Sequence, residues 1–534
     1  MQEEMDQGAS EHFAALVAKV PPSTARYWAD RAACVDAPGA YKAFFESPAG
    51  VALLHRLVVA LHLVIGLMVG GGIRQVILIL ELAQLLPFVA SSVGTHQGIA
   101  HWIEQEVVRF GRDERPRLAE QMAPKRITVC QDETFHPETC LVVIEPVSNF
   151  ILAEQYVEHR DTPTWSETMT HAQEGLAVTI VQSTSDEGKG ILGYARQAGA
   201  QHSPDVFHVQ HDASRAISLP LARQVNDADK AVGEARAQLA QVEQQQRAWA
   251  STPHGPGRPP AFETRKEKAQ GAITVALQDL EQARDRQERA RTALRGLSRE
   301  YHPVDLGTGA PRSAEQTTHK LQEHFETLRN VADEAQLSER SLAGLAKAER
   351  VLPAMTSTLR FVHEEVAERI AHLDMSPAMT QALTETMVPA AYLERVANRS
   401  SNAHDREKLR ATAHERRTAG FAALAALGIH DEERRCAVEV EAAACADIFQ
   451  RASSCVEGRN GQLSLCQHHL HLISSQRLEA LTVIHNYFIR RPDGTTAAER
   501  FFAARPRDLF QYLLTRIPAP PRPACKRPRN PTLH

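Results

Sequence analysis

The sequence predicts an α/β core inside a mainly α-helical chain, with a long helical hairpin inserted into that core. Apolar residues recur at the 3.6-residue spacing of helices up to about residue 120, and at the two-residue spacing of strands from Lys125 to about Gln210. After Asp212, segments rich in Ala, Gln, Glu and Arg continue for more than two hundred residues without strand patterns. These changes indicate separate units, and a chain of 534 residues has room for roughly three or four of them.

Composition and breaks in the pattern divide the chain into five parts. We expect a helical N-terminal domain at 1–120, the first part of the core at 121–215, an all-helical insertion at 216–445, the second part of the core at 446–515, and a basic, Pro-rich, disordered tail at 516–534.

The composition is that of an ordinary soluble protein, with 43% hydrophobic and 23% charged residues. The formal net charge of −5 excludes a strong overall attraction to nucleic acid, so DNA contacts must come from local patches such as Arg477–His534, which has 11 Lys or Arg against 4 Asp or Glu. The eight cysteines form no C-x-x-C pair and no signal peptide is visible, which favours a reduced cytoplasmic compartment. The apolar run 57–73 is short and contains His62, so we expect a buried helix and no membrane association.

The N-terminal part contains a candidate helix-turn-helix at 73–110. Its pattern predicts a helix, a short turn from Pro87 to Gly94, and a second helix that Thr95 caps. The alternative is a small packing domain, because the segment has no evident basic recognition face.

The core is predicted from a series of alternating apolar runs. We expect strands at 126–131, 140–146, 150–157, 177–183 and 205–210, and helices at 164–174 and 188–198. Three strands in a meander, followed by helix, strand, helix and strand, is the order of a ribonuclease H-like core, which is a mixed sheet flanked by helices.

The insertion begins with two long helical segments, 221–250 and 262–300. Between them lies "STPHGPGRPPA", which no helix can cross. We expect an antiparallel coiled-coil hairpin (221–300) roughly 45 Å long, suited to protein contact or to reach.

Two acidic residues follow predicted strands of the core. Asp132 comes at the end of the first strand, and Asp186 follows the fourth in "LAVTIVQSTSDEGKG". In a ribonuclease H-like sheet these strand ends are neighbours, so the carboxylates would face each other and repel unless a cation lies between them. Oxygen-only ligands suit Mg²⁺ or Mn²⁺. Side chains alternate along a strand, so Glu133 cannot point into the same site as Asp132.

These motifs resemble the catalytic core of the DDE transposases of bacterial insertion sequences, in the branch related to Mutator-like elements. The resemblance rests on Asp132 at a strand end, on Ser-Asp186 followed by Gly-Lys-Gly and a helix, and on "SPDVFHVQHDASRAI". In that branch an Asp or Cys is followed closely by a His, and Asp205 and His208 match this structural motif. The alternative is that His208 is a polar strand-end residue, and the resemblance assigns it no metal.

The resemblance also implies a third carboxylate on a helix after the insertion. Glu457, in "SCVEGRN", resembles the family's N-x-x-E-x-x-N helix; alternatively, Ser454 and Glu457 form a capping box that only closes the helix start. The segment from Arg477 to Phe502 resembles the C-terminal signature of a transposase subgroup with a long insertion. The possible DNA-phosphate contacts beside this active site are Arg459, Arg490, Arg491 and Arg500.

The resemblance implies a metal-dependent enzyme that cleaves DNA strands and transfers them. Asp132, Asp186 and Glu457 would hold two Mg²⁺ or Mn²⁺ ions, and water and then a 3′-hydroxyl would attack phosphodiesters. The implied partners are double-stranded DNA, at the element ends and at the target, and further copies of the chain in a homo-oligomer. The implied location is the bacterial cytoplasm, with the nucleoid. The alternatives are a non-catalytic coiled-coil scaffold or DNA-binding protein, and an inactive transposase remnant.

Overall fold

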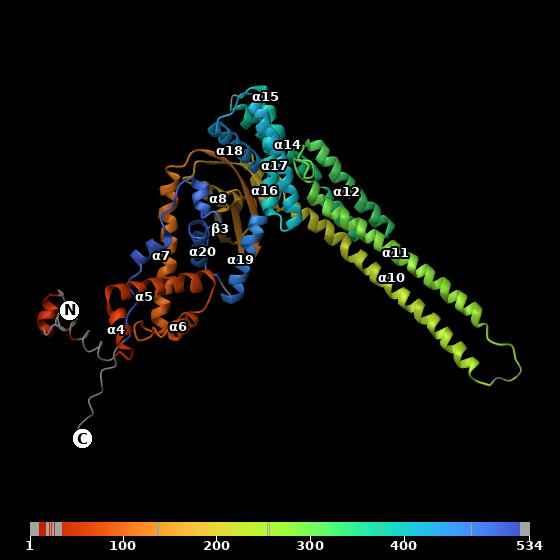
Figure 1. Ribbon diagram of the computed structural model, residues 1–534, viewed down its shortest axis with the longest axis horizontal. Helices are drawn as coiled ribbons and strands as arrows, with labels where there is room; N and C mark the ends of the chain where they lie inside the picture. Colours follow the sequence, from red (N-terminus) through yellow and green to blue (C-terminus); the bar gives the residue numbers. More distant parts are fainter. Residues whose placement is uncertain are drawn as a thin grey trace, which may run out of the picture.

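A computed structural model describes residues 10–17, 21, 23, 26, 35–135, 138–253, 255, 257–373, 375–470 and 473–523. Most of these residues are helical, and the strands form one mixed five-stranded sheet. Figure 1 shows an arch in which the N-terminal helices, the sheet-containing core and a long helical arm follow one another. The expectation of a mixed sheet within a mainly helical chain is confirmed.

The helices fall into three groups along the chain. The N-terminal group is α2 (Glu11–Val17), α4 (Gly39–Glu46), α5 (Pro48–Leu61), the π-helix η1 (His62–Met68), α6 (Ile73–Leu82) and α7 (Val93–Ala119). The core contains α8 (Thr162–Gln173), α9 (Lys189–Ala198), α19 (Ser454–Leu470), α20 (Ser475–Tyr487), α21 (Ala497–Phe502) and α22 (Leu509–Arg516). The arm and insertion consist of α10 (Val206–Ala250), α11 (Phe262–Glu300), α12 (Ala314–Glu334), α13 (Glu339–Glu349), α14 (Leu352–Ala371), α15 (Pro377–Ala382), the π-helix η2 (Leu383–Met387), α16 (Val388–Arg399), α17 (Ala403–Ala426) and α18 (Glu432–Ile448).

The sheet has the strand order β3-β2-β1-β4-β5. Its strands are β1 (Lys125–Phe135), β2 (Thr139–Glu145), β3 (Phe150–Val157), β4 (Val178–Ser185) and β5 (Gln201–Pro204). The central strand β1 pairs antiparallel with β2 and parallel with β4, and β5 is parallel to β4. The first four predicted strands and both predicted core helices are confirmed to within a few residues, apart from a longer end of β1.

The fifth predicted strand is misplaced. Residues 205–210 begin the long helix α10, and the strand is the preceding segment Gln201–Pro204. Asp205 ends the strand because its side-chain Oδ1 accepts a hydrogen bond from the N–H of Phe207 (2.7 Å), as an N-cap residue does. The buried residues Val206 and Val209 are three positions apart, which is helical spacing.

The two faces of the sheet are covered by different helices. On one face, Val129 belongs to a core that includes Trp165 of α8; on the other, Val142 belongs to a core that includes Val456 of α19. Helices before and after the insertion therefore complete one sheet.

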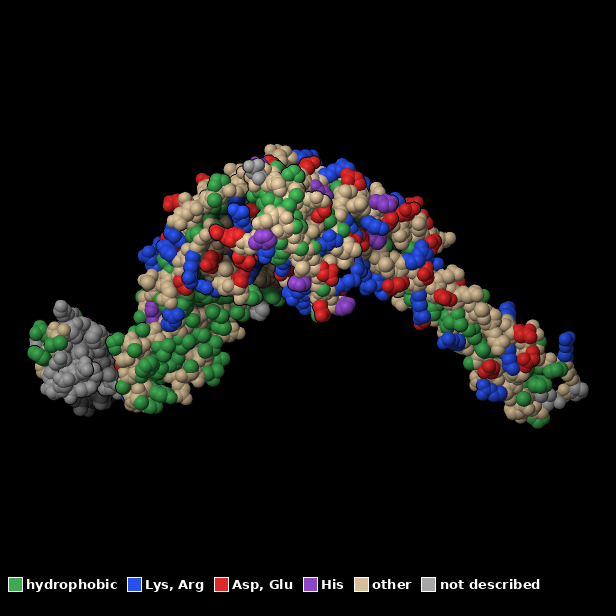
Figure 2. All heavy atoms as spheres, turned by 45° about the horizontal axis from the view of Figure 1, so that its top comes forward, with side chains coloured by type: hydrophobic (Ala, Val, Ile, Leu, Met, Phe, Trp, Pro, Cys, Tyr) green, Lys and Arg blue, Asp and Glu red, His purple; other side chains and the backbone are tan. Residues whose placement is uncertain are grey.

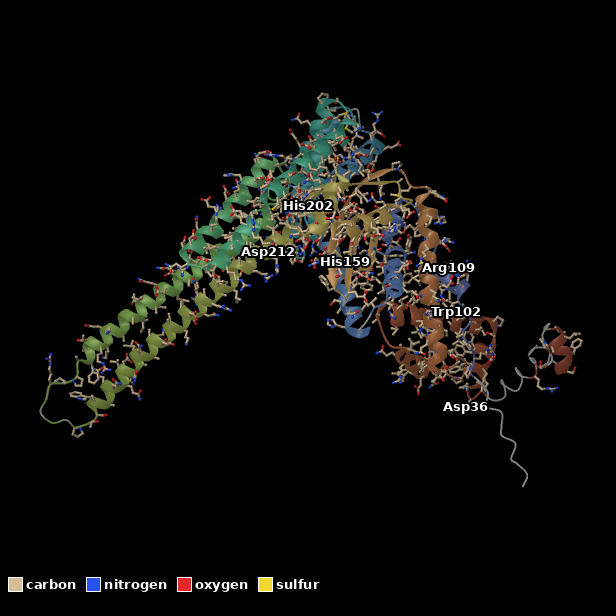
Figure 3. The ribbon with its side chains drawn as sticks, turned by 180° about the vertical axis from the view of Figure 1, so that it is seen from behind. Asp36, Trp102, Arg109, His159, His202 and Asp212 are labelled. Atoms are coloured by element: carbon tan, nitrogen blue, oxygen red, sulfur yellow. The ribbon has the colours of Figure 1, made fainter. Side chains whose placement is uncertain are left out.

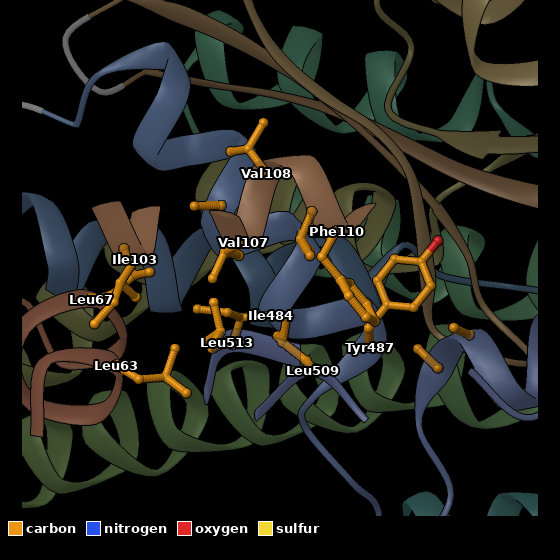
Figure 4. Packing of buried hydrophobic residues seen from close by; sticks show 14 of the residues in the cluster. Leu63, Leu67, Ile103, Val107, Val108, Phe110, Ile484, Tyr487, Leu509 and Leu513 are labelled. Carbon is orange, nitrogen blue, oxygen red and sulfur yellow. The ribbon is translucent and has the colours of Figure 1, made fainter. Parts of the chain in front are cut away.

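Helix α7 joins the N-terminal helices to the core. Figure 4 shows Val107 and Phe110 of α7 near Ile484 and Tyr487 of α20 and Leu513 of α22. The rings of Phe110 and Tyr487 meet edge to face, with centroids 5.7 Å apart. Segments nearly four hundred residues apart in the sequence thus share one hydrophobic core.

The candidate helix-turn-helix is present as two helices, α6 and α7, but the cap differs from the predicted one. Helix α7 begins at Val93, and the side chain of Ser92 accepts a hydrogen bond from the N–H of Thr95 (3.0 Å). Arg109 and Arg112 of α7 already pair with Glu106 and Glu479. Because these arginines are already paired, the structure favours a packing role for the two helices over DNA recognition.

Apolar side chains gather on the surface of the N-terminal helices, as Figure 2 shows. Leu53 of α5 and Leu82 of α6 are 49% and 75% exposed. Among the described residues, one helical stretch, Pro48–Met68, is long and apolar enough by composition to cross a membrane, and 33% of its most apolar window is buried. One such helix is a weak indication of a membrane span, because core helices of soluble proteins have the same character. The buried helix expected at 57–73 is buried on one face, where Leu63 lies.

The arm is a hairpin of α10 and α11, which run side by side away from the core (Figure 1). Helix α10 has 45 residues because it begins at Val206, so it spans roughly 65 Å, more than the predicted length. Val232 of α10 and Leu280 of α11 share a small core. Six of the buried positions of α11 form a series with seven-residue spacing, Phe262, Ala269, Ala276, Ala283, Ala290 and Leu297; Leu280, Ala293, Leu294 and Gly296 are buried as well.

The start of the basic tail contacts the N-terminal helices. The carbonyl of Pro521 accepts a hydrogen bond from the N–H of Ala90 (2.8 Å), so disorder does not begin at residue 516. The rest of the predicted tail, 524–534, lies outside the described residues.

Candidate active site

Asp132 and Asp186 lie at the same edge of the sheet. Cys130 of β1 is opposite Thr184 of β4 in their parallel pairing, so two residues further along each chain Asp132 comes opposite Asp186. Neighbouring strands are about 4.8 Å apart. The structure therefore brings together the two acids that the sequence predicts to be neighbours.

Asp132 is a constrained carboxylate, only 9% exposed. Its Oδ1 accepts a hydrogen bond from the N–H of Glu133 (2.8 Å), and its Oδ2 accepts one from Nδ2 of Asn460 (3.1 Å). Burial raises the pKa of Asp132 to about 7; the charges of Asp186 and Glu457 add to the rise, and the Glu133 N–H opposes it. Holding this carboxylate ionised is therefore costly without a positive partner.

Asp186 follows β4 in the turn that leads to α9. Its Oδ1 accepts a hydrogen bond from the N–H of Gly188 (2.9 Å). A Cβ atom at Gly188 would lie 2.9 Å from the same Oδ1, a contact too short for any other residue unless the carboxylate shifts. The sequence Ser-Asp-Glu-Gly thus fixes the carboxylate at the strand end.

Glu457 lies in the first turn of α19 with its side chain exposed. Its charge contributes to the raised pKa of Asp132, so Glu457 lies within electrostatic range of that carboxylate. The capping-box alternative fits less well. Helix α19 begins at Ser454, which puts Ser453 at the capping position and Val456 three residues after it.

Asp205 ties the start of α10 to the segment before α19. Besides the Phe207 N–H, it accepts hydrogen bonds from the N–H (3.1 Å) and the hydroxyl of Ser453. Burial raises the pKa of Asp205, but hydrogen bonds from His208, Ser453 and Phe207 outweigh it and leave the pKa below its ordinary value. Asp205 is therefore a structural carboxylate, as the motif implies.

His208 is a cation beside the acids. Its Nδ1 lies 3.2 Å from Oδ2 of Asp205, and this hydrogen bond is the main reason that its pKa rises to about 9. The charges of Asp132 and Asp186 raise the pKa further, whereas burial lowers it. The raised pKa favours the protonated, cationic form of His208 beside these acids. It lies on α10, so the alternative of a strand-end residue is wrong.

Asn460 is a site residue that sequence reasoning did not assign. Its Nδ2 holds Asp132, and within the described part of the chain its Oδ1 is buried without a hydrogen-bond partner. It lies three residues after Glu457, on the same side of α19. This spacing is the sequence feature that could have identified Asn460 as a site residue.

Glu133 points to the opposite face of the sheet from Asp132. It accepts a hydrogen bond from Nε1 of Trp165 (3.2 Å) and pairs with Arg160 (2.8 Å). The predicted alternation of the two adjacent acids matches this arrangement, and the role of Glu133 is structural.

Arg459 is not available to DNA. It is 5% exposed and forms two parallel hydrogen bonds with the buried carboxylate of Glu154 (2.8 and 2.6 Å). The expected phosphate contact is therefore wrong, because a helix residue two positions from Glu457 points inward and fills the interior with a paired charge.

Arg490, Arg491 and Arg500 do not lie beside the acids. Arg500 donates to the carbonyl of Ser148 (2.7 Å) and Arg491 to that of Val147 (3.4 Å), in the turn after β2. Because β2 is antiparallel to β1, this turn lies toward the opposite end of the sheet from Asp132. Arg490 and Arg491 are exposed, so they are accessible to phosphate groups, but at a distance from the acids.

The donors suit a hard divalent cation by their chemistry but not by their spacing. Among the described residues, no group of three or more His, Cys, Asp or Glu is close enough together to hold a metal ion. Three carboxylates and the unpartnered amide oxygen of Asn460 are nevertheless the oxygen ligands that Mg²⁺ and Mn²⁺ prefer. A cation would offset the burial and, to a lesser extent, the neighbouring negative charges that raise the pKa of Asp132.

Comparison with known proteins gives one match. Residues 383–529 match a family of unknown function (DUF6399). This segment begins at η2, extends into the tail and contains Glu457 and Asn460, whereas Asp132 and Asp186 precede it. No curated protein matches the chain.

Proposed function

We propose that this protein is a DDE-type transposase, which cleaves DNA strands and joins them to a target with the help of divalent cations. The observation that supports the proposal best is the pairing of two acids at neighbouring strand ends, with a third acid in electrostatic range of one of them. Asp132 and Asp186 come from adjacent parallel strand ends, and Glu457 comes from a helix that packs across the sheet.

The architecture supports a ribonuclease H-like core. The expected order of a meander, then helix, strand, helix and strand agrees with β3-β2-β1-β4-β5 and its single antiparallel to parallel change at β1. The seven-residue spacing of buried positions in α11 supports the interpretation of the arm as a coiled coil.

The chain's own residues would hold and orient the reacting groups. Asp132, Asp186 and Glu457 are the carboxylates for two Mg²⁺ or Mn²⁺ ions, which when bound activate an attacking oxygen and stabilise a leaving one. Asn460 orients Asp132 through its Nδ2, and the His208 cation moderates the repulsion among the acids. No side chain acts as nucleophile. Water attacks the phosphodiester and the 3′-oxygen leaves as a 3′-hydroxyl. That 3′-hydroxyl then attacks a phosphodiester of the target DNA, and the target strand's own 3′-oxygen leaves.

The proposal implies double-stranded DNA as the partner and a homo-oligomer that holds two element ends. It also implies a bacterial cytoplasmic location with the nucleoid.

An inactive remnant of such an enzyme is the second candidate. It is favoured by the lack, among described residues, of a compact group of three metal-binding side chains. A remnant would keep the fold and any DNA binding but would not cut DNA.

The test is nicking of supercoiled plasmid DNA by the full-length protein with Mg²⁺ or Mn²⁺. We expect nicking that EDTA stops and that Asp132→Asn abolishes. Nicking that persists in Asp132→Asn would overturn the proposed site, and DNA binding without nicking under every metal condition would favour the remnant.

A further inference from the structure

A cavity of about 700 Å³ lies where the arm joins the rest of the insertion. The end of α11, one face of α16, the start of α17 and the segment between α18 and α19 form its walls. Its lining cations are Arg295, Arg299, Arg395, Arg399, Lys408 and Arg451. Asp405 is the acidic residue among the described residues that line it, so positive charge is in large excess.

Two of the cations are fixed in the wall. Arg395 donates from Nη1 to the carbonyl of Phe449 (3.0 Å) and pairs with Asp447 (3.3 Å). Arg451 donates from Nη1 to the carbonyl of Ser298 (2.6 Å). These contacts hold both guanidinium groups in place on the cavity wall.

The other four cations form no ion pair within the described part of the chain. Arg295, Arg299, Arg399 and Lys408 are exposed, and no side-chain hydrogen bond or ion pair involves them there. Helix dipoles account for part of the cluster, because Arg299 and Arg399 lie in the last turns of α11 and α16. Lys408 lies near the start of α17, where a dipole gives a cation no stabilisation.

The cations are close enough to disfavour one another. Burial, and next to it the charge of Arg399, lower the pKa of Arg395 to about 10. Burial and the charges of Arg451, Arg312 and Arg395 hold the pKa of the enclosed His302 well below its ordinary value. The cavity lining thus carries a net positive charge, which Asp405 and the paired Asp447 offset only in part.

We propose that this cavity binds the phosphate groups of a polyanionic ligand. Guanidinium groups pair with phosphate through two parallel hydrogen bonds, and the excess of cations exceeds what a single carboxylate could neutralise. The volume is that of an ordinary ligand pocket. The phosphates come from a nucleic-acid backbone or from a free polyphosphate.

A second cavity extends the first. It has a volume of about 1320 Å³, shares Arg395 and Arg399 with the first cavity, and is also lined by Arg410, Arg417 and Arg491. Its lining includes the acids Glu394, Glu439, Asp447 and Asp493, and Arg417 pairs with the first two, so it adds little net positive charge. None of Asp132, Asp186 and Glu457 lines either cavity, so the inference stands apart from the catalytic proposal.

The experiment measures binding of two probes by the full-length protein in EDTA, which removes catalysis. Tripolyphosphate is titrated by calorimetry, and a labelled DNA duplex by fluorescence anisotropy at several salt concentrations. The cavity variant is Arg399→Gln with Lys408→Gln, two exposed side chains. The matched control, Arg236→Gln with Arg340→Gln, removes the same charge from exposed positions on α10 and α13.

We expect the cavity variant, and not the control, to bind tripolyphosphate roughly a hundredfold more weakly, at about tenfold for each lost cation. If DNA is the source of the phosphates, duplex affinity falls in parallel and the slope of log K against log salt decreases by about 1.8. If free polyphosphate is the source, the duplex binds both variants equally. Binding of both probes by the cavity variant as tightly as by the control would overturn the proposal.

Discussion

The acidic edge of the sheet and the cation-lined cavity are both clusters of like charge, but they are built differently. Asp132 and Asp186 are placed by the register of two strands, and Asp132 is almost enclosed. Arg399 and Lys408 extend from helices and are exposed. Rigid, desolvated charges suit chemistry on a positioned atom, whereas solvated charges on long side chains suit binding. The difference supports the proposals of a reaction at the first cluster and of ligand attachment at the second.

The largest expected effect concerns the acids. Asp132→Asn and Asp186→Asn should each reduce plasmid nicking by more than about 10³-fold, because each removes a charge that the site needs. Glu133→Gln is the matched control, since Glu133 faces Trp165 on the other side of the sheet. DNA binding measured by anisotropy should be unchanged in all three. Equal loss of nicking in Glu133→Gln would mean that the effect is structural.

The second prediction separates a buried cation from the cavity cations. Arg459→Met leaves the carboxylate of Glu154 buried with Thr482 as its remaining side-chain partner, and should lower the free energy of unfolding by about 3 to 5 kcal/mol. Urea unfolding followed by circular dichroism measures this. Arg399→Gln should change it by less than about 0.5 kcal/mol. Similar changes in the free energy of unfolding for both variants would contradict the distinction between buried, paired charges and exposed, solvated charges.

The third prediction is a pH dependence of the metal-free protein. Asp132 has a pKa of about 7 in the folded chain against a reference value of 3.8, so its protonated form stabilises the fold at low pH and this contribution is lost as the pH rises to about 7. In EDTA at pH 8, Asp132→Asn should therefore be more stable than wild type, by about 1 to 3 kcal/mol. The advantage should vanish below about pH 4. An Asn variant less stable at pH 8 would show that the carboxylate is not under strain.

The smallest effect is expected at Asn460. Asn460→Ala removes the side chain that orients Asp132 and should weaken Mn²⁺ binding by about tenfold without changing the thermal midpoint. Asn460→Asp is the companion variant. It keeps the size but adds charge, so it should raise the pKa of Asp132 further and shift the pH profile of Mn²⁺ binding upward. Unchanged binding in both would remove Asn460 from the site.

The strands of the sheet could be predicted from the sequence because each is a short apolar run, and one register buries its apolar side chains. The alternation through Asp132 and Glu133 even gave the face to which each acid points. The start of α10 was misread because "DVFHVQ" alternates like a strand. At this position the hydrogen bond from the Phe207 N–H to the Asp205 side chain caps a helix. Residue propensities alone do not predict that hydrogen bond.

The arginines show which information the sequence alone does not contain, namely which charged side chains become paired in the fold. Arg459 and Arg399 are both arginines on amphipathic helices, and neither sequence neighbourhood tells which one is paired. Glu154, the partner of Arg459, lies 305 positions away on β3, so burial of the pair depends on tertiary packing. The cavity cations come from α11, α16, α17 and the segment before α19, and they become neighbours only when the insertion folds.

The central claim is that the acidic edge of the sheet holds divalent cations. Titration with Mn²⁺ followed by electron paramagnetic resonance tests it directly, in wild type, Asp132→Asn and Glu133→Gln. We predict bound Mn²⁺ in wild type and Glu133→Gln, and its loss in Asp132→Asn. Equal Mn²⁺ binding by all three proteins, or none by wild type, would contradict the account.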